Sequence, residues 1–204
     1  MPVVPGGPPE DPGRPGPASG KKALRAVFLQ RRAARDVAER ESAASAVTET
    51  LLRHLAGVPT VAAFVPDPGE PGHGRLPADL TQLGARVLLP VVPAVGVELA
   101  WAVDTGSLRP GRFGLLEPTG PRLPPAALAT AGVVVVPAVA VACDGVRLGR
   151  GGGFYDRALA HVRGDATVVA LVFDDELVET LPAEPHDRRV DAVVTPSGGW
   201  RTLA

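Results

Sequence analysis

Short hydrophobic runs alternate with amphipathic segments along most of this chain. Runs rich in Val, Leu and Ala predict β-strands at residues 60–65, 86–91, 97–103, 133–136, 167–173 and 191–194. Segments between them predict helices at residues 77–83, 125–131, 154–162 and 176–181. The four consecutive valines at 133–136 indicate a strand covered on both faces, as in a parallel sheet. The alternation predicts an α/β fold, a three-layer sandwich with a mainly parallel central sheet.

The N-terminal region has a different pattern. Residues 1–20 contain seven Pro and five Gly and little apolar material, which predicts a disordered tail. Beyond it, apolar residues recur at helical spacing in two stretches, 24–28 and 47–55, which predict a helix followed by a second helix or an extension of the first. Gly57 ends this helical region. We therefore expect one domain over residues 21–204, preceded by the tail.

Composition narrows the class of protein. Hydrophobic residues make up 45% of the 204 residues and aromatic residues only 4%, so we expect a core of Val, Leu and Ala. A net charge of -1 gives no overall attraction to nucleic acid or to an anionic membrane. The single cysteine excludes an internal disulfide, and no segment has the pattern of a secretory signal or the length of a membrane span. We expect a soluble, cytoplasmic protein.

The segment 147–157 carries the strongest chemical signal, with the sequence Arg-Leu-Gly-Arg-Gly-Gly-Gly-Phe-Tyr-Asp-Arg. Its glycines allow backbone N–H groups to approach a ligand, and Arg147 and Arg150 suit phosphate or carboxylate. Asp156 adds a carboxylate where a helix is expected to begin. The segment lies between a predicted strand and a predicted helix, a common place for ligands in α/β sheets. It lacks the Gly-Lys-Ser/Thr of a Walker A loop and the spacing of a dinucleotide fingerprint. It indicates a nucleotide and metal site, with a flexible turn bearing surface arginines as the alternative.

A basic stretch precedes this region. Residues 21–35 contain six basic residues and no acid. Three interpretations remain open: a solvated helix face, a nucleic-acid arm, or a phosphate site in which Lys21 and Arg25, one helical turn apart, hold a triphosphate. The stretch lacks the interleaved aromatic residues of a stacking surface, which weakens the nucleic-acid interpretation.

Isolated polar residues elsewhere say less. Glu70 lies in a predicted loop, where most acids are merely solvated. His186, Asp187 and Asp191 form a polar cluster before the last predicted strand, which a helix–strand junction explains nearly as well as catalysis does. Cys143 has no histidine at obvious spacing, and packing is its simplest role.

Five segments in order resemble one enzyme family. The signature Arg-Leu-Gly-x-Gly-x-Gly-Tyr-Tyr-Asp-Arg stands at 147–157, with Phe154 in place of the first Tyr. The other segments are Lys-x-x-Leu-Arg at 21–25, Gly-Glu at 69–70, Gly-Leu-Leu-Glu-Pro at 114–118, and Leu-Pro-Ala-Glu-Pro-His-Asp at 181–187 leading to Val190-Asp191. Over residues 21–198 the chain resembles the 5-formyltetrahydrofolate cyclo-ligase (5,10-methenyltetrahydrofolate synthetase) family.

The resemblance implies a fold and a reaction. The fold would be of the NagB/RpiA/CoA-transferase-like kind. ATP and Mg²⁺ would drive closure of 5-formyltetrahydrofolate to 5,10-methenyltetrahydrofolate, with release of ADP and phosphate. The γ-phosphoryl group would pass to the formyl oxygen, N10 of the folate would attack the activated carbon, and phosphate would leave. The partner would be the folate substrate alone, with no nucleic acid and no membrane, and the protein would be a monomer.

The resemblance also assigns site residues. ATP binding falls to Lys21, Arg25, Arg147, Gly149, Arg150, Gly151, Gly152, Gly153, Phe154 and Tyr155. Lys21, Arg147 and Arg150 would be catalytic. The folate would contact Glu70, Arg150, Gly151, Gly152, Gly153 and Phe154. Mg²⁺ would bind Asp156 and Asp191, because this hard cation prefers carboxylates and water.

Two departures from the family pattern leave alternatives open. Gly-His-Gly-Arg stands at 72–75, where the family usually has a short Asp/Pro-x-Thr step. Phe154 lacks the hydroxyl of the usual Tyr. The changed loop favours the alternative of a catalytically weak ATP- or folate-binding paralogue with a regulatory role. A nucleic-acid-associated protein that uses the basic stretch 21–35 is the second alternative.

Overall fold

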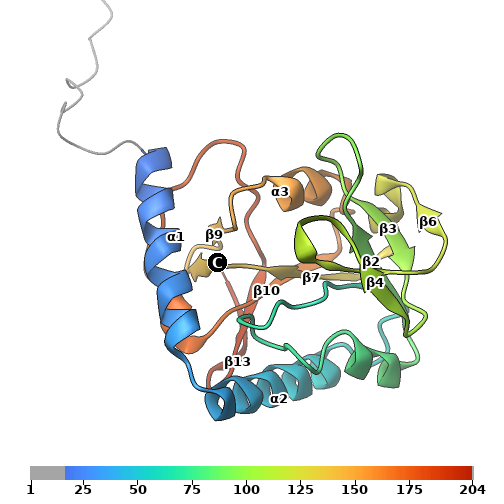
Figure 1. Ribbon diagram of the computed structural model, residues 1–204, viewed down its shortest axis with the longest axis horizontal. Helices are drawn as coiled ribbons and strands as arrows, with labels where there is room; N and C mark the ends of the chain where they lie inside the picture. Colours follow the sequence, from blue (N-terminus) through green and yellow to red (C-terminus); the bar gives the residue numbers. More distant parts are fainter. Residues whose placement is uncertain (1–16, 204) are drawn as a thin grey trace, which may run out of the picture.

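A mainly parallel sheet forms the centre of the computed structural model, which describes residues 17–203 (Figure 1). Within those residues the sheet has eight strands. Their order is β13 (Gly199–Thr202), β12 (Ala192–Thr195), β10 (Thr167–Leu171), β7 (Val133–Pro137), β1 (Thr60–Ala62), β2 (Arg86–Val91), β3 (Ala100–Val103) and β6 (Arg122–Leu123). The five strands from β12 to β2 are parallel, whereas β13, β3 and β6 are antiparallel to their neighbours at the two edges.

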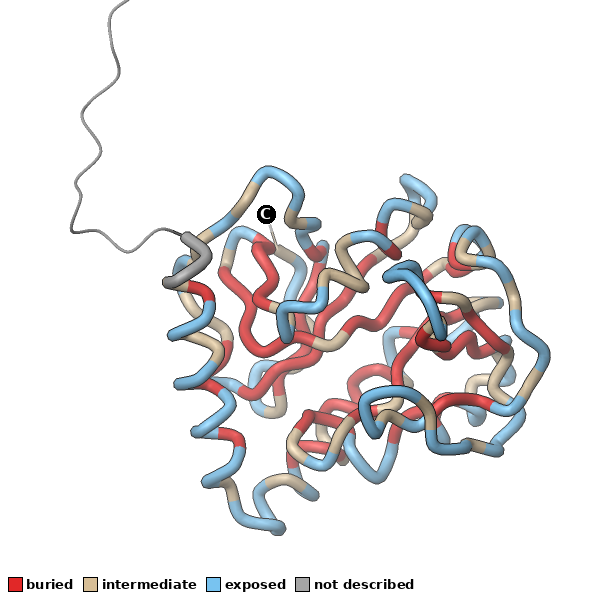
Figure 2. The backbone as a smooth tube through the Cα atoms, turned by 45° about the horizontal axis from the view of Figure 1, so that its top comes forward, coloured by how far each residue is buried: buried red, intermediate tan, exposed pale blue. Residues whose placement is uncertain are grey.

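Helices cover both faces of the sheet. Along β7, Val133 and Val135 face one apolar cluster, and Val134 and Val136 face the other. The first cluster receives α2 (Val37–His54) and the 3₁₀ helix η1 (Ala78–Leu83). The second receives η3 (Pro125–Thr130), α3 (Phe154–Ala158) and η4 (Leu159–His161). Figure 1 shows α2 and α3 on opposite sides of the sheet, and the buried stretches of Figure 2 run between them. The α/β fold class and its mainly parallel central sheet are therefore confirmed.

Helix α1 (Pro17–Ala34) lies outside these layers. It packs on a small sheet formed by β11 (Leu177–Val178), β8 (Ala140–Ala142) and β9 (Arg147–Leu148), with Phe28 against Ala140 and Leu148. Most of α1 is exposed, with single buried residues spaced along it (Figure 2). Because β8 follows β7 closely in the chain, this contact holds α1 beside the carboxyl end of the central sheet.

The first two helices are separate. The side chain of Asp36 accepts a hydrogen bond from the backbone N–H of Glu39 at 2.7 Å, which caps the start of α2 and breaks the helical run. Helix α1 begins at Pro17, although the sequence pattern predicted a disordered tail up to residue 20. Residues 1–16 of that tail lie outside the described residues.

The predicted helix at 176–181 is wrong. The chain forms a 3₁₀ turn, η5 (Asp174–Glu176), and then enters β11, whose residues pair with β8. The sequence also missed the short pairings of β8 and β9, and the hairpin of β4 (Leu108–Pro110) and β5 (Leu116–Pro118), which flanks η2 (Arg112–Gly114). Strands of two or three residues are too short for a periodic pattern, so only the folded partner strand reveals them.

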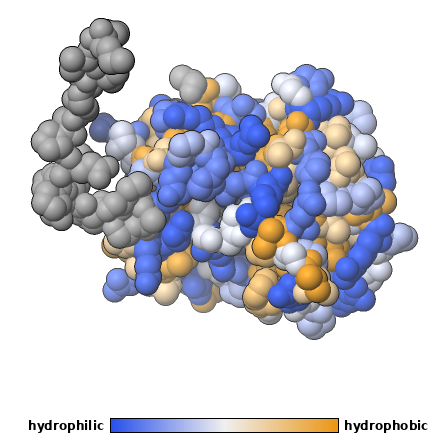
Figure 3. Space-filling view, turned by 90° about the horizontal axis from the view of Figure 1, so that it is seen from above, coloured by the Kyte–Doolittle hydropathy of each residue, from blue (hydrophilic) through white to orange (hydrophobic). Residues whose placement is uncertain are grey.

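The remaining predictions differ mainly in length. β2 has its predicted bounds, whereas β1 ends at Ala62 and β3 begins at Ala100. Charged and polar residues cover most of the face shown in Figure 3, with smaller apolar areas among them. In the part of the chain that the structure describes, every helix is too short or too polar to cross a membrane.

The packing of α2 on the sheet yields a test of the core. Leu51 is fully buried, so Leu51→Ala should lower the free energy of unfolding by about 2–5 kcal/mol through lost apolar contact and the cavity left behind. Val37 is exposed on the same helix, and Val37→Ala should change that free energy by less than about 0.5 kcal/mol. Chemical denaturation measures both values, and equal losses would contradict the packing described.

Candidate active site

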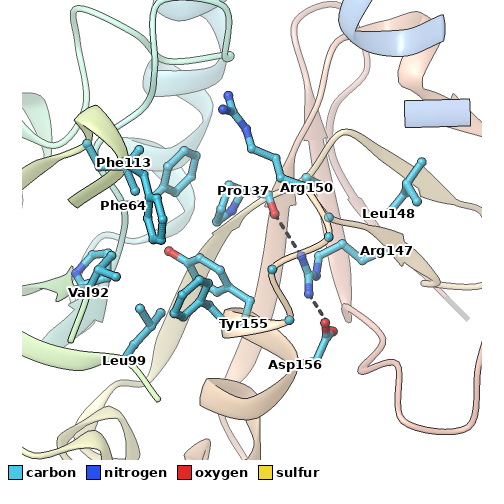
Figure 4. Close-up of a pocket in the computed structure, with 18 of the residues that line it drawn as sticks. Phe64, Val92, Leu99, Phe113, Pro137, Arg147, Leu148, Arg150, Tyr155 and Asp156 are labelled. Atoms are coloured by element: carbon cyan, nitrogen blue, oxygen red, sulfur yellow. Dashed lines mark hydrogen bonds and ion pairs between the residues drawn. The ribbon is translucent and has the colours of Figure 1, made fainter. Parts of the chain in front are cut away.

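A pocket at the carboxyl ends of the parallel strands brings together all the predicted site residues except Asp191. Its cavity volume is about 290 Å³. Phe64 follows β1, Val92 follows β2, and Pro137 ends β7, and all three line it. Helix α1 and residues 147–153 of the glycine-rich segment also line the pocket, with Arg147, Leu148 and Arg150 on the side away from Phe64 and Val92 (Figure 4). Ligands of open α/β sheets bind at this edge, where the strand ends and the loops that follow them converge.

The pocket has an apolar half and a charged half. Phe64, Val92, Leu99, Phe113 and the ring of Tyr155 gather on one side (Figure 4). On the other side lie several carboxylates and four basic residues, which are Lys21, Arg25, Arg147 and Arg150. The first half offers apolar contact to a flat ligand, and the second offers cations that suit an anionic group together with carboxylates that suit a metal ion.

The glycines of 149–153 let this segment pass close to α1. Gly151 has a φ of +99°, which side-chain-bearing residues rarely adopt, and a Cβ there would lie 3.4 Å from the guanidinium carbon of Arg25. Arg25 Nε donates a hydrogen bond to the carbonyl oxygen of Gly149 at 2.7 Å. Among the described residues, no carboxylate lies within ion-pair distance of Arg25. The contact between α1 and the segment 149–153 therefore presents backbone groups and the Arg25 cation to the pocket.

Arg147 connects the strand end with the start of α3. It is buried, and its Nη2 donates to Asp156 Oδ1 at 2.8 Å while its Nη1 donates to the carbonyl oxygen of Pro137 at 3.3 Å (Figure 4). The guanidinium is thus fixed at the edge of β7, and the Asp156 carboxylate is held beside it in the pocket wall.

Lys21 forms the second ion pair of the charged half. Its Nζ lies 2.7 Å from Asp187 Oδ2 and 2.9 Å from Glu184 Oε2. Burial would lower the pKa of Lys21, but hydrogen bonds to the two carboxylates outweigh burial and raise it above its usual range. Burial would likewise raise the pKa of Asp187, and the hydrogen bonds from Lys21 and from the backbone N–H of Glu184 bring it below its usual range. With their pKa values moved in these directions, Lys21 and Asp187 are both charged near neutral pH.

Arg150 and Glu70 meet across the mouth of the pocket. Arg150 Nη2 lies 3.0 Å from Glu70 Oε1, and its Nη1 lies 2.7 Å from Asp67 Oδ2. The Glu70 side chain is buried, whereas that of Arg150 is half exposed. Burial raises the pKa of Glu70 above its usual range, although the charge of Arg150 opposes the shift. The pocket therefore contains a buried acid that is paired with a half-exposed cation at its mouth.

Asp191 is the predicted site residue that the structure separates from the others. It precedes β12, and its Oδ2 accepts a hydrogen bond from the backbone N–H of Val168 at 2.7 Å, near the start of β10. The amino ends of these parallel strands point away from the pocket, which lies at their carboxyl ends. The expectation that Asp191 shares a metal with Asp156 is corrected accordingly, because the two lie at opposite ends of the strands.

The sequence missed the role of Asp187 in the pocket. Ligand atoms of Glu184, His186 and Asp187 lie within 4.8 Å of one another, and all three residues line the pocket. The motif at 181–187 contained this signal, but spacing alone did not distinguish Asp187 from Asp191. Only the contact between this segment and Lys21 on α1 places Asp187 in the site.

The changed loop at 72–75 turns away from the pocket. Its residues are absent from the pocket lining, which includes Asp67 and Glu70. Gly72 has a φ of +87°, and a Cβ there would lie 2.8 Å from a methyl group of Leu76, so the chain folds back on itself. The departure in sequence therefore leaves the pocket wall intact.

Comparison with known proteins now identifies the family. The sequence matches the 5-formyltetrahydrofolate cyclo-ligase family over residues 17–196. The chain belongs to this family. It is 44% identical over 184 residues to the 5-formyltetrahydrofolate cyclo-ligase of Mycolicibacterium smegmatis, covering 88% of this chain and 95% of that protein. The Escherichia coli cyclo-ligase is 36% identical over 145 residues, which cover 69% of this chain and 80% of the relative.

Solved structures of cyclo-ligase relatives agree with this membership. The solution structure of Aquifex aeolicus 5,10-methenyltetrahydrofolate synthetase superposes with a TM-score of 0.70 at 28% identity, covering 90% of this chain and 92% of that one. A synthetase from Mycoplasma pneumoniae has a TM-score of 0.68 at 21% identity, covering 85% and 96%, and supports the fold alone. The narrower NagB/RpiA/CoA-transferase-like designation stays a prediction.

The ion pair of Lys21 yields a prediction for stability. The contribution of Asp187 is complete above the pKa of an unfolded aspartate, about 3.9, and is lost as the pH falls through its lower folded-state pKa. That of Lys21 is complete below about pH 10.4 and is lost as the pH rises further. Lys21→Met should therefore lower the free energy of unfolding by about 1.5–3 kcal/mol near neutral pH.

The loss caused by Lys21→Met should shrink as the pH falls below about 3.9, where Asp187 of the unfolded chain becomes protonated, and should vanish below the lower pKa of Asp187 in the folded protein. Urea denaturation of wild type and variant at the two pH values measures the difference. Lys22→Met, at the exposed neighbouring position, is the matched control and should be nearly neutral. A loss that stays the same at both pH values would contradict the ion pair.

Proposed function

We propose that this chain is an ATP-dependent 5-formyltetrahydrofolate cyclo-ligase that forms 5,10-methenyltetrahydrofolate and releases ADP and phosphate. The observation that carries the proposal is the two-sided pocket, in which an apolar wall adjoins a group of basic residues in a chain of this family. A folate offers a flat ring system, and ATP offers a polyanion. The pocket has one half for each.

In this proposal the charged half binds the ATP phosphates. Lys21, Arg25, Arg147 and the backbone of 149–155 face the polyanion. Lys21 and Arg147 are already fixed by carboxylates, so phosphate oxygens replace or share those partners without a search for the side-chain conformation. Arg150, half exposed at the mouth, follows the transferred phosphoryl group.

The apolar half holds the folate in the same scheme. Phe113 and Phe154 lie with ring centroids 6.4 Å apart and inclined by 60°, and both line the pocket beside Tyr155. The ring of Phe154 supplies apolar contact where the family usually has Tyr, so folate packing does not need the missing hydroxyl. Glu70 accepts hydrogen bonds from the N–H groups at the pterin end. The Arg150 and Glu70 pair then separates as the two substrates enter.

The reaction needs positioning and charge neutralisation more than covalent help from the protein. A formamide oxygen is a poor leaving group, and transfer of the γ-phosphoryl group to it creates a good one. N10 then attacks the activated carbon and loses its proton, which closes a new five-membered ring, and the former formyl oxygen leaves as part of inorganic phosphate. Lys21, Arg147 and Arg150 offset the charge that develops on the transferred group.

We include Mg²⁺ in the proposal, held by Asp156 and Asp187. Both carboxylates line the charged half, and the ligand atoms of Glu184, His186 and Asp187 already lie within 4.8 Å of one another. Mg²⁺ prefers carboxylates and water, so the two aspartates suit it better than His186. When bound, the ion would neutralise phosphate charge.

The internal pairing of the basic stretch supports a small-molecule enzyme over a nucleic-acid-associated protein. Arg35 pairs with Glu39 and Asp175, and Arg31 lies 3.8 Å from Asp175. Cations held this way offer little free charge to a phosphate backbone. The pairing therefore favours an enzyme that acts on a small molecule. We propose that this enzyme is monomeric and cytoplasmic, with a catalytically weak paralogue as the alternative.

A spectroscopic assay of methenyltetrahydrofolate tests the proposed function. Wild-type protein with Mg²⁺ and 5-formyltetrahydrofolate should form product only when ATP is added. Lys21→Met should lower kcat/KM for ATP by about 10–100-fold, because it removes a charge-assisted contact, whereas Lys22→Met should leave it unchanged. Folded wild-type protein that forms no product would support the weak paralogue instead.

Titration with Mg²⁺ tests the metal ligands. Asp187→Asn should raise the Mg²⁺ concentration needed for half-maximal activity at least about tenfold, because an amide is a weaker ligand than a carboxylate. Asp191→Asn is the matched control: its amide oxygen still accepts the Val168 N–H, and the Mg²⁺ requirement should stay as in wild type. A shift for Asp191→Asn and none for Asp187→Asn would reverse the assignment.

A further inference from the structure

Arg32 of α1 lies in the interior although the basic stretch around it is mostly exposed. Its side chain is 3% exposed, and that of Glu176 in η5 is fully buried. Arg32 Nε donates to Glu176 Oε1 at 2.7 Å, and its Nη2 donates to Glu176 Oε2 at 2.7 Å and to the carbonyl oxygen of Ala138 at 2.6 Å. Two nitrogens of the guanidinium are thereby fixed against η5 and the end of β7.

The third nitrogen points to the pocket acid. Arg32 Nη1 is buried and has no hydrogen-bond partner among the described residues, and it lies 4.0 Å from Glu70 Oε1. Glu70 is itself 8% exposed, and it lines the pocket together with Ala138. One guanidinium is therefore hydrogen-bonded to the buried carboxylate of Glu176 and lies within ion-pair distance of a second buried carboxylate, that of Glu70 in the pocket wall.

Stability alone is a poor explanation for this arrangement. Removing two opposite charges from water costs about as much as their attraction returns, and well-packed apolar residues often replace a buried ion pair without loss. Arg32 Nη1 takes no part in the pair with Glu176, and it lies buried beside an acid in the wall of the pocket. The geometry points instead to a role for Arg32 that acts through Glu70.

The charges around Glu70 indicate that role. Arg150 lies 3.0 Å from Glu70 but is half exposed at the mouth of the pocket. Asp67 donates its backbone N–H to Glu70 at 3.0 Å, and its carboxylate adds a negative charge nearby. Burial and then the charge of Glu70 raise the pKa of the Tyr155 hydroxyl. Burial and Asp67 both favour a protonated Glu70. Once Arg150 turns to a phosphate, Arg32 is the cation that stays beside Glu70.

We propose that Arg32, clamped by Glu176, is a positioning residue that holds the Glu70 carboxylate in place as an anion for the pterin end of the folate. The inference rests on the proposed function, in which Glu70 contacts the folate. A carboxylate accepts from two neighbouring N–H donors of the pterin, whereas a protonated acid presents a donor to one of them. Arg32 thus sets folate affinity without touching the folate.

The test removes Arg32 without leaving an unpaired buried charge. Arg32→Met alone strands Glu176 in the interior, and such a variant can fail to fold for that reason. The double variant Arg32→Met/Glu176→Met removes both charges and keeps side chains of similar length. Circular dichroism and thermal unfolding check that it is folded. Arg31→Met, at the exposed neighbouring position, is the matched control.

We expect the folded double variant to show a KM for 5-formyltetrahydrofolate at least about tenfold above wild type, with the KM for ATP unchanged. The acidic limb of kcat/KM for the folate should also move to higher pH, because Glu70 loses the fixed cation that favours its charged form. Arg31→Met should behave as wild type in both measurements. A merely structural role for Arg32 would not move a pH profile.

Two outcomes separate this inference from the proposed function. A folded double variant with the folate KM and pH profile of wild type would overturn the role of Arg32, while wild-type turnover would still support the cyclo-ligase. Wild-type protein that binds 5-formyltetrahydrofolate without forming product would instead overturn the proposed function. Calorimetric folate binding to wild type and double variant would then decide the role of Arg32, and equal affinities would overturn it.

Discussion

The docking of α1 against the carboxyl end of the sheet is the contact on which the pocket depends. One face of this helix provides Lys21, Arg25 and Arg32, and each reaches a segment far away in the chain: the motif at 181–187, the glycine-rich segment, and η5. The apolar part of the contact is small and centres on Phe28. Polar contacts therefore contribute much of the interaction that orients the helix, and the same contacts form part of the charged half of the pocket.

The contacts of α1 contribute to the site more than to the stability of the central layers. The central sheet with α2 and α3 forms two apolar clusters without help from α1, so the layers have their own source of stability. The ion pairs of α1 are added at the edge where the strands end. Their carboxylates keep Lys21 and Arg32 in place. In the proposed function, this order lowers the entropic cost of binding at the charged half.

The sequence predicted the parts that depend on local pattern. The valine run of β7, the bounds of β2 and the glycine-rich segment all follow from residues close together in the chain. The helix expected at 176–181 is wrong because Leu177 and Val178 pair with β8, a strand more than thirty residues earlier in the chain. Asp191 and Asp187 carry the same chemistry four residues apart, and only the strand direction and the contact with Lys21 tell them apart. Such errors arise wherever a distant partner decides the outcome.

The distribution of the pocket along the chain has a consequence for folding. Lys21 lies near one end and Asp187 near the other, while Glu70, Glu117 and Arg147 line the space between them. No fragment of the chain contains the whole site, so a ligand recognises only the completed fold. The free energy of ligand binding then stabilises the native state as a whole. Each bound substrate should therefore oppose local unfolding of the segments around Lys21 and Asp187.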